Sequence, residues 1–206
     1  MMLPKLYPIA DRVKLDARGT SVREFAREMA QAGVGVLQYR DKVGAPNEVL
    51  RAAKEIAAEF AGRDCLLIMN DRADLALLAG WGLHVGHEDL SPGDARKVMG
   101  AGVIGVSTHN DEQVIAAEAG TADYVAIGPV FATATKSDAE AVVGLEGVRR
   151  ARVLTEKPLV AIGGIGLGNA QQAIEAGADS VAVISGLLVE RRRTRDVTRD
   201  FLEILG

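Results

Sequence analysis

The chain has 206 residues, enough for one well-buried α/β domain or two small ones, and no linker-like stretch divides it, so we expect a single domain over residues 1–206. A formal net charge of −4 gives no field that attracts nucleic acid, and the single cysteine, Cys65, excludes disulfide frameworks and cysteine metal sites. The chain shows no signal-peptide pattern and no apolar segment long enough to span a membrane, so we expect a soluble protein of the cytoplasm.

Eight short apolar runs predict buried strands. In chain order they read KLYPIAD, VGVLQYRDK, CLLIMND, GLHVG, VIGVSTHN, YVAIGPV, PLVAIGGI and SVAVISG. Their continuous apolar character is typical of parallel strands that are covered on both faces. Most of the runs end in polar residues or glycines. We therefore expect the apolar part of each such run to be buried and its carboxyl end to carry residues that can take part in chemistry.

Segments with helical spacing lie between these runs. Ser91 and Asn169 are suitable N-caps for two of them, and glycine residues follow several others. The predicted helices cover residues 22–32, 46–60, 71–78, 92–99, 112–119, 144–154, 170–176 and 194–205.

The alternation of strands and helices predicts an α/β fold of the (β/α)8 TIM-barrel type, at the short end of its size range. The competing fold is a doubly wound open sheet, which would carry a GxGxxG sequence after its first strand. Here the first strand is followed by DRVKLDARG, so we favour the barrel. In a barrel, the carboxyl ends of all the strands meet on one rim.

Gln38, Arg40 and Lys42 alternate at the end of the second predicted strand, so their side chains share one face. Two cations beside an amide suit a phosphate or diphosphate, because both cations form charge-assisted hydrogen bonds with phosphate oxygens. The alternative is that the cations form salt bridges with Asp41 and other carboxylates of the rim.

Asp71 and Asp89 follow consecutive predicted strands, so the two carboxylates can approach each other. Magnesium prefers one or two carboxylates together with waters and a substrate phosphate, so the pair is a candidate Mg²⁺ site. The alternative is helix capping, since Asn70 and Asp71 open a predicted helix and Asp89 precedes Ser91.

Glycine-rich turns end the last two strands, at residues 161–166 and 184–186, which is the commonest phosphate site on this fold. The loop at residues 128–138 carries Thr133, Thr135 and Lys136, which suit a lid that closes over phosphate, although a solvated loop accounts for them more simply.

Three histidines remain to be interpreted. His84 and His87 are three residues apart, so on a strand they face opposite sides and one zinc ion cannot easily take both. His109 follows Ser107 and is either a general acid–base residue of the pocket or a polar loop residue.

The strand ends and their flanks carry the motifs LQYRDK, MNDRADLAL, GLHVGHEDL, GVSTHN, DYVAIGPVFATATKSDA, VAIGGIG and GADSVAVIS. In combination and order they resemble the thiamine-phosphate synthase (thiamine-phosphate pyrophosphorylase) family over nearly the whole chain. The resemblance implies a transferase that joins 4-amino-2-methyl-5-diphosphomethylpyrimidine to a thiazole phosphate (the carboxylated form) with Mg²⁺, releasing pyrophosphate. It also implies a dissociative reaction, in which the diphosphate leaves before the thiazole nitrogen attacks.

The resemblance assigns roles residue by residue. Arg40, Lys42, Ser107 and Lys136 would be catalytic, and Asp71 and Asp89 would bind Mg²⁺. The pyrimidine diphosphate would be held by Gln38, Tyr39, Arg40, Asp41, Lys42, Asn70, Ser107 and Lys136. The thiazole phosphate would be held by Thr133, Ala134, Thr135, Gly164, Ile184 and Ser185.

The chain departs from the family pattern at two places. The first strand reads YPIAD, where the family usually has Ala and then Ile-Thr-Asp, so the surroundings of Asp11 are open. Tyr39 replaces a usual aliphatic residue, and we expect it to face away from the rim.

Two other functions are compatible with the sequence. A related thiazole tautomerase shares the barrel and would need an acid–base residue such as His109, and a non-catalytic binder of thiamine metabolites would not need both metal carboxylates. We expect small-molecule partners and neither nucleic acid nor membrane; a homodimer is compatible with the chain, although no motif supports one.

Overall fold

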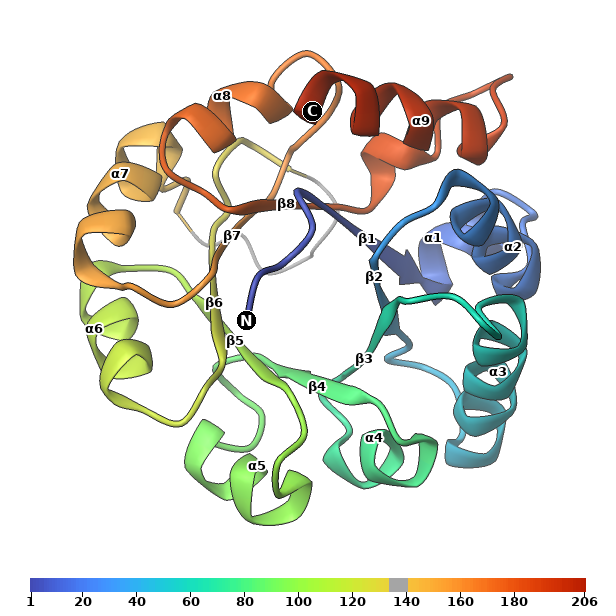
Figure 1. The fold of residues 1–206 in the computed structure, drawn as a ribbon, viewed down its shortest axis with the longest axis horizontal. Coiled ribbons are helices and arrows are strands. Elements are labelled where there is room, and N and C mark those ends of the chain that lie inside the picture. The colour runs from blue at the N-terminus through green and yellow to red at the C-terminus, as the bar shows by residue number, and fades with distance from the viewer. Residues whose placement is uncertain (134–140) are drawn as a thin grey trace.

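The computed structural model describes residues 1–133 and 141–206. Parallel strands β1 to β8 close into a barrel in chain order, and helices surround it (Figure 1). The strands are β1 Leu6–Asp11, β2 Val36–Arg40, β3 Leu66–Asn70, β4 Gly82–Val85, β5 Ile104–Thr108, β6 Tyr124–Ile127, β7 Leu159–Ile162 and β8 Ser180–Val183. The predicted (β/α)8 barrel is confirmed.

The helices follow the strands around the outside of the barrel. They are α1 Arg12–Ala17, α2 Val22–Ala32, α3 Pro46–Glu59, α4 Ala73–Ala79, α5 Pro92–Met99, α6 Asp111–Ala119, α7 Gly144–Leu154, α8 Ala170–Glu175 and α9 Thr194–Leu205, with a short 3₁₀ helix η1 at Ser185–Leu187. None of the helices in the described part of the chain is long and apolar enough to cross a membrane.

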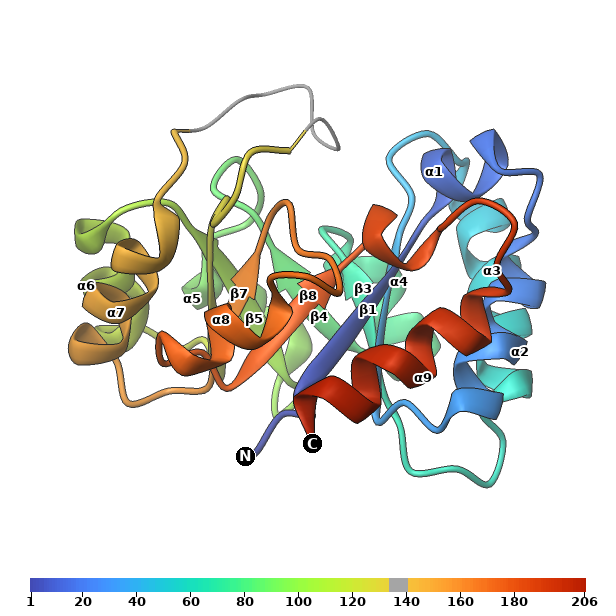
Figure 2. The same ribbon diagram turned by 90° about the horizontal axis from the view of Figure 1, so that it is seen from above.

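The two ends of the chain close the barrel. β1 pairs with β8 in parallel, with Leu6 opposite Val181, and the Lys5 ammonium donates to the Leu205 carbonyl at 2.6 Å. Figure 2 shows both termini on the same side of the molecule, opposite α1, which follows the carboxyl end of β1. The rim of strand ends is therefore on the far side from the termini.

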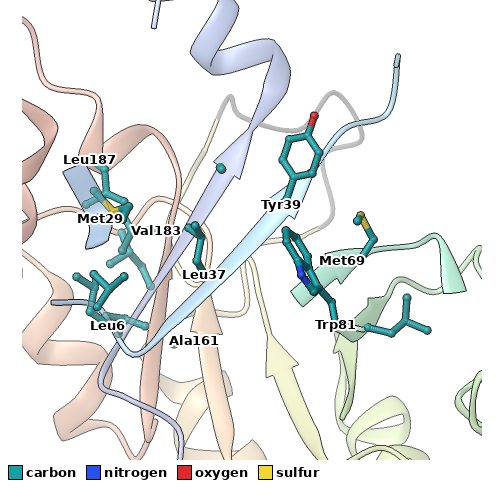
Figure 3. Close-up of a cluster of buried hydrophobic side chains, with 14 of the residues drawn as sticks. Leu6, Met29, Leu37, Tyr39, Met69, Trp81, Ala161, Val183 and Leu187 are labelled. Atoms are coloured by element: carbon teal, nitrogen blue, oxygen red, sulfur yellow. The ribbon is translucent and has the colours of Figure 1, made fainter. Parts of the chain in front are cut away.

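Alternation along the strands produces two apolar layers. Outward-facing residues such as Leu37, Tyr39 and Met69 pack between the barrel and its helices (Figure 3). Inward-facing residues such as Val36, Ile68 and Val160 fill the barrel itself. Tyr39 lies in the outer layer, with none of its surface exposed, as predicted.

Several helix boundaries match the sequence prediction, including those of α2, α5 and α9. The hydroxyl of Ser91 accepts from the Asp94 backbone at the start of α5, which confirms that N-cap. Helix α1 was missed because it is only six residues long and buries Leu15 alone. Its N-cap is Asp11, whose carboxylate accepts from the Lys14 backbone at 3.0 Å.

One predicted helix start and one predicted side-chain cap differ from the structure. The helix expected over residues 71–78 begins at Ala73, because Asp71 has φ 63° and a left-handed residue cannot continue an α-helix. Asn169 stands at the N-cap position of α8, but its side chain makes no capping bond. Its Oδ1 instead accepts from the Gly166 backbone at 2.8 Å, so Asn169 shapes the loop that precedes the helix.

Candidate functional site

The mouth of the barrel contains a pocket of about 390 Å³, counting the part that is open to solvent. One wall is polar and comes from β2 to β6, and the other is apolar and comes mainly from β7 and β8. The pocket is lined by Tyr7, Ile9, Gln38, Arg40, Asn70, His84, Ser107, Tyr124, Ala126, Val160, Ile162, Ala182 and Ile184.

Both predicted cations of the rim are in contact with carboxylates. The guanidinium of Arg40 donates to Asp11 at 2.6 Å, and Asp11 is 2% exposed. The ammonium of Lys42 lies 2.5 Å from the carboxylate of Asp71. Gln38 and Arg40 line the pocket, and Lys42 sits just beyond the strand at its edge. The two cations thus form salt bridges with carboxylates of the rim, as the alternative interpretation has it, but the partners are Asp11 and Asp71 and not Asp41.

Asp41 instead holds the turn after β2. Its carboxylate accepts from the backbone of Val43 at 3.0 Å and of Gly44 at 2.7 Å, and from the Tyr39 hydroxyl at 2.9 Å. Burial alone would raise the pKa of Asp41, but the backbone hydrogen bonds of Gly44 and Val43 outweigh it and lower the pKa. The side chains of Tyr39 and Asp41 are thus engaged in this turn and are absent from the pocket lining, which leaves only their backbone for a ligand in the mouth of the barrel.

Asp71 and Asp89 do approach each other, as the strand order predicts. Burial first, and then a hydrogen bond with Asp89, raise the pKa of Asp71. Burial would raise the pKa of Asp89 as well, but the bond with Asp71 and the Gly86 backbone N–H at 2.7 Å lower it. At this pair the protonated form of Asp71 is therefore favoured, whereas the ionised form of Asp89 is favoured.

Capping does not explain either carboxylate. Helix α4 has Arg72 at its N-cap position without a side-chain cap, and α5 is capped by Ser91. Asp71 holds a left-handed conformation that is uncommon for residues other than glycine, although aspartate adopts it more often than most, and its backbone N–H donates to the His84 carbonyl at 2.7 Å. Such backbone conformations cluster at functional sites.

The donor set of this pair fits magnesium. Two carboxylates in contact on the rim of the pocket would leave the remaining positions of an octahedral ion to waters and to oxygens of a bound ligand. Among residues 1–133 and 141–206 there is no group of three or more His, Cys, Asp or Glu side chains that could hold a metal, so a dedicated protein cage is absent from that part of the chain.

The turns at the ends of β7 and β8 place backbone that is not covered by bulky side chains at the rim. Gly163 and Gly164 have φ of 102° and 65°, and a side chain at Gly164 would come within 2.6 Å of the Ala132 carbonyl oxygen. Asn169 fixes this turn by donating to the Gly164 carbonyl at 3.0 Å and accepting from Gly166. Gly164 and Ser185 are both exposed, so they are accessible to a ligand.

The segment after β6 runs beside this turn. The backbone of Val130 donates to the Ile162 carbonyl at 2.8 Å, and that of Phe131 donates to Gly163 at 3.0 Å. Thr133, half-buried, is the last described residue before the gap. The predicted ligands Ala134, Thr135 and Lys136 lie outside the described residues.

The histidines differ in position. His84 is inside the barrel and 7% exposed, whereas His87 is exposed, so they do not face one zinc site. His109 donates from Nδ1 to the Gly128 carbonyl at 2.6 Å, since a carbonyl can only accept, and its backbone donates to Gln113 at 2.7 Å. His109 does not line the pocket and instead ties the loop after β5 to the end of β6.

Sequence reasoning missed the buried polar chain that forms the floor of the pocket. Its members are Tyr7, Tyr124 and His84, which connect Gln38 to Ser107. The available signal was alternation, which points all of these residues inward. It was obscured because His84 was considered only together with His87, and because Tyr7 and Tyr124 fall within apolar runs.

A closed (β/α)8 barrel with its pocket and polar side chains at the carboxyl ends of the strands defines a barrel enzyme. The family model described as thiamine monophosphate synthase matches residues 6–187, and the chain belongs to this family of transferases.

Individual relatives agree with the family match. The chain is 47% identical to a thiamine-phosphate synthase of Koribacter versatilis, over 100% of this chain and 97% of that protein. It is 38% identical to a thiamine-phosphate synthase of Chloroflexus aurantiacus, over 89% and 85%. A solved thiamine phosphate pyrophosphorylase from Pyrococcus furiosus superimposes with a TM-score of 0.88 at 32% identity, covering 98% of this chain and 95% of that one.

Proposed function

We propose that the protein is a thiamine-phosphate synthase that condenses 4-amino-2-methyl-5-diphosphomethylpyrimidine with 4-methyl-5-(2-phosphoethyl)thiazole, in its carboxylated form, and releases pyrophosphate. The observation that carries this proposal is the contact between Asp71 and Asp89 beside Lys42, on the rim of the pocket. A site that expels diphosphate needs positive charge and a metal at the leaving group, and this cluster offers positions for both.

The residues of the chain would divide the work between two anion sites. Arg40 and Lys42 would exchange their carboxylate partners for diphosphate oxygens, with Asn70 and Lys136 as further ligands. Asp71 and Asp89 would hold Mg²⁺, which when bound supplies charge that stabilises the leaving diphosphate. The thiazole phosphate would lie against the turns of β7 and β8, held by Thr133, Ala134, Thr135, Gly164, Ile184 and Ser185.

The pocket between the two anion sites suits a dissociative reaction. Gln38 and Ser107 would orient the pyrimidine, while the apolar wall of Val160, Ile162 and Ala182 keeps water from its reactive carbon. The attacking thiazole nitrogen carries no proton, so no general base is required. That agrees with His109, which is not among the residues that line the described pocket, and it disfavours the tautomerase alternative.

The direct test supplies both substrates with Mg²⁺ and follows thiamine phosphate and pyrophosphate together. We expect equal amounts of the two products, and none when Mg²⁺ is removed by a chelator. Well-folded protein that forms neither product contradicts the proposal, and conversion of the thiazole phosphate alone would establish the tautomerase instead. A non-catalytic binder would retain both substrates in equilibrium dialysis and release no pyrophosphate.

We also propose that residues 1–206 form a single domain that works on small molecules in the cytoplasm, with a homodimer as the candidate assembly. Light scattering on the full chain after size exclusion decides between monomer and dimer. Fractionation of cells that express the protein, followed by immunoblotting, tests its location.

A further inference from the structure

Five inward-facing polar side chains form a continuous hydrogen-bonded chain across the interior of the barrel. Gln38 Nε2 lies 3.0 Å from the Tyr7 hydroxyl, which lies 2.7 Å from the Tyr124 hydroxyl. The Tyr124 hydroxyl lies 2.9 Å from His84 Nδ1, and His84 Nε2 lies 2.9 Å from Ser107 Oγ. Gln38, Tyr7, Tyr124 and His84 are all under 9% exposed, and both ends of the chain line the pocket.

The barrel makes room for this chain at Gly105. In the strand register, Gly105 stands between His84 on β4 and Tyr124 on β6. A side chain at Gly105 would come within 1.9 Å of the Tyr124 ring, so only glycine lets that ring cross to His84. The rings of His84 and Tyr124 have centroids 5.5 Å apart, and those of Tyr7 and Tyr124 are 6.0 Å apart.

The direction of the hydrogen bonds follows from counting hydrogens. Burial raises the pKa of Tyr7 and of Tyr124, so each hydroxyl keeps one hydrogen that needs an acceptor. The Tyr7 oxygen already accepts from the Gln38 amide, and among the described residues its only other hydrogen-bond partner is Tyr124. Tyr7 therefore donates to Tyr124, and Tyr124 donates to His84 Nδ1.

The state of His84 follows in turn. Since Nδ1 accepts, the neutral ring carries its hydrogen on Nε2 and donates it to Ser107 Oγ. A hydrogen on Nδ1, or a doubly protonated ring, would force Tyr124 to donate to Tyr7 and leave the Tyr7 hydrogen without an acceptor in the interior. Reversing the chain completely would require the Gln38 amide to turn over, against the position of Nε2 beside Tyr7.

We propose that Tyr7, Tyr124 and His84 are positioning residues that fix the hydrogen-bonding direction of the pocket, so that Gln38 presents its Oε1 as an acceptor and Ser107 presents its hydroxyl as a donor. Ser107 becomes a donor because its oxygen accepts from His84 and its own hydrogen is directed elsewhere. One acceptor and one donor match the amino group and a ring nitrogen of an aminopyrimidine. This assignment of ligand chemistry rests on the proposed function.

The first test reads His84 directly and needs no substrate. Long-range ¹H–¹⁵N spectra of the full chain at neutral pH separate imidazole tautomers, and a His84→Gln variant assigns the signal among the three histidines. We expect the pattern of a neutral ring protonated on Nε2, and a mixture of tautomers in Tyr124→Phe, since Nδ1 then loses its donor. A wild-type ring protonated on Nδ1 or on both nitrogens overturns the proposal.

The second test separates positioning from simple loss of stability. Tyr124→Phe keeps the ring over Gly105 but removes the hydroxyl, so we expect KM for the pyrimidine diphosphate to rise roughly fivefold, the value of one hydrogen bond. The KM for the thiazole phosphate should stay unchanged. Thr108→Val is the matched control, because it removes a buried hydroxyl that bonds the Ala126 carbonyl at 2.9 Å outside this chain, and we expect both KM values to stay at wild-type level.

The outcomes are distinct. Equal rises in both KM values for Tyr124→Phe, or no rise in either, overturn the positioning role. Absence of condensation in the wild-type protein contradicts the proposed function, and the tautomer measurement then decides by itself whether the hydrogen-bond direction is as inferred.

Discussion

At Asp71 the requirements of folding and of metal binding differ: the fold favours the protonated side chain, whereas a metal ligand must be ionised. Asp71 is half-buried in a left-handed conformation, next to a second carboxylate, and its pKa is raised by that burial and by Asp89. A raised pKa means that the protonated form is favoured on folding, so this residue stabilises the metal-free protein at low pH and the contribution is lost as pH rises through the raised value.

We therefore predict that Asp71→Asn leaves the melting temperature of the metal-free protein unchanged or higher, because the amide resembles the protonated acid. Turnover with Mg²⁺ should fall about a hundredfold, the usual effect of removing one group that stabilises a developing charge. Differential scanning calorimetry and the coupled product assay provide the two readouts. Parallel loss of folding and turnover would show that Asp71 is a structural residue.

Cys65 is the counterpart of Asp71, a titratable group with no part in the site. It stands just before β3, and burial, followed by the nearby charge of Asp64, raises the pKa of its thiol to about 12. Only the thiolate reacts with alkylating agents. At about pH 8 that leaves roughly one molecule in ten thousand in the reactive form.

We predict that iodoacetamide modifies Cys65 slowly in the native protein and rapidly in urea. Intact-protein mass spectrometry follows the labelling. The native protein should keep its activity until the labelling is complete. Labelling in native buffer at the rate of free cysteine would contradict this description of the thiol.

At the scale of elements, the sequence predicted the barrel well because its strongest signals are local. Apolar runs and helical stripes each lie within a dozen or so residues, and α2, α5 and α9 were placed correctly. Helix α1 has only one buried side chain, Leu15, so the sequence shows no periodic pattern of apolar residues that would predict a helix there. The true role of Asn169 depends on the fold of its loop, which no local pattern encodes.

The candidate site divides in the same way. Asp71 and Asp89 could be brought together from chain order alone, because neighbouring parallel strands end on the same rim. The polar chain could not be assembled in this way, because Tyr7 and Tyr124 are 117 residues apart and meet only across the barrel interior. The direction of the hydrogen bonds in this chain also depends on which side chains meet, and these contacts form only when the barrel is closed.

Gly105, on strand β5, supports the site indirectly, because it leaves room for the Tyr124 ring and does not line the pocket itself. Gly105→Ala places a methyl group against the Tyr124 ring, and overpacking of this kind costs about 1–3 kcal/mol. We predict that loss in urea denaturation, together with a higher KM for the pyrimidine diphosphate. Gly166→Ala, where no atom lies within 4 Å of the added group, tests whether loss of any loop or strand glycine has the same effect. A wild-type KM in Gly105→Ala would show that Tyr124 reaches His84 regardless.

On the scale of the whole molecule, closure of the barrel depends on its last helix. α9 packs on α2 and lies beside β1, and it buries Val197, Phe201 and Leu205 where the first and last strands meet. The described residues of the site lie on the strands or in the segments that follow them, and the spacing of the strands depends on that closure. We therefore expect substitutions in α9 to lower stability, and substitutions of site residues on the rim to lower turnover per folded molecule.

We predict that Phe201→Ala lowers the free energy of unfolding by about 3–5 kcal/mol, because it leaves a cavity under a fully buried ring. That is a large share of the 5–15 kcal/mol typical of a domain, so part of the protein should be unfolded at 37 °C. Ile204→Ala on the same helix is the control: its side chain is 40% exposed, and its loss should cost less than about 1 kcal/mol. Turnover per folded molecule, corrected by circular dichroism, should equal that of the wild type in both variants, since neither touches the pocket. A fall in that corrected turnover for Phe201→Ala alone would mean that α9 shapes the rim as well as closing the barrel.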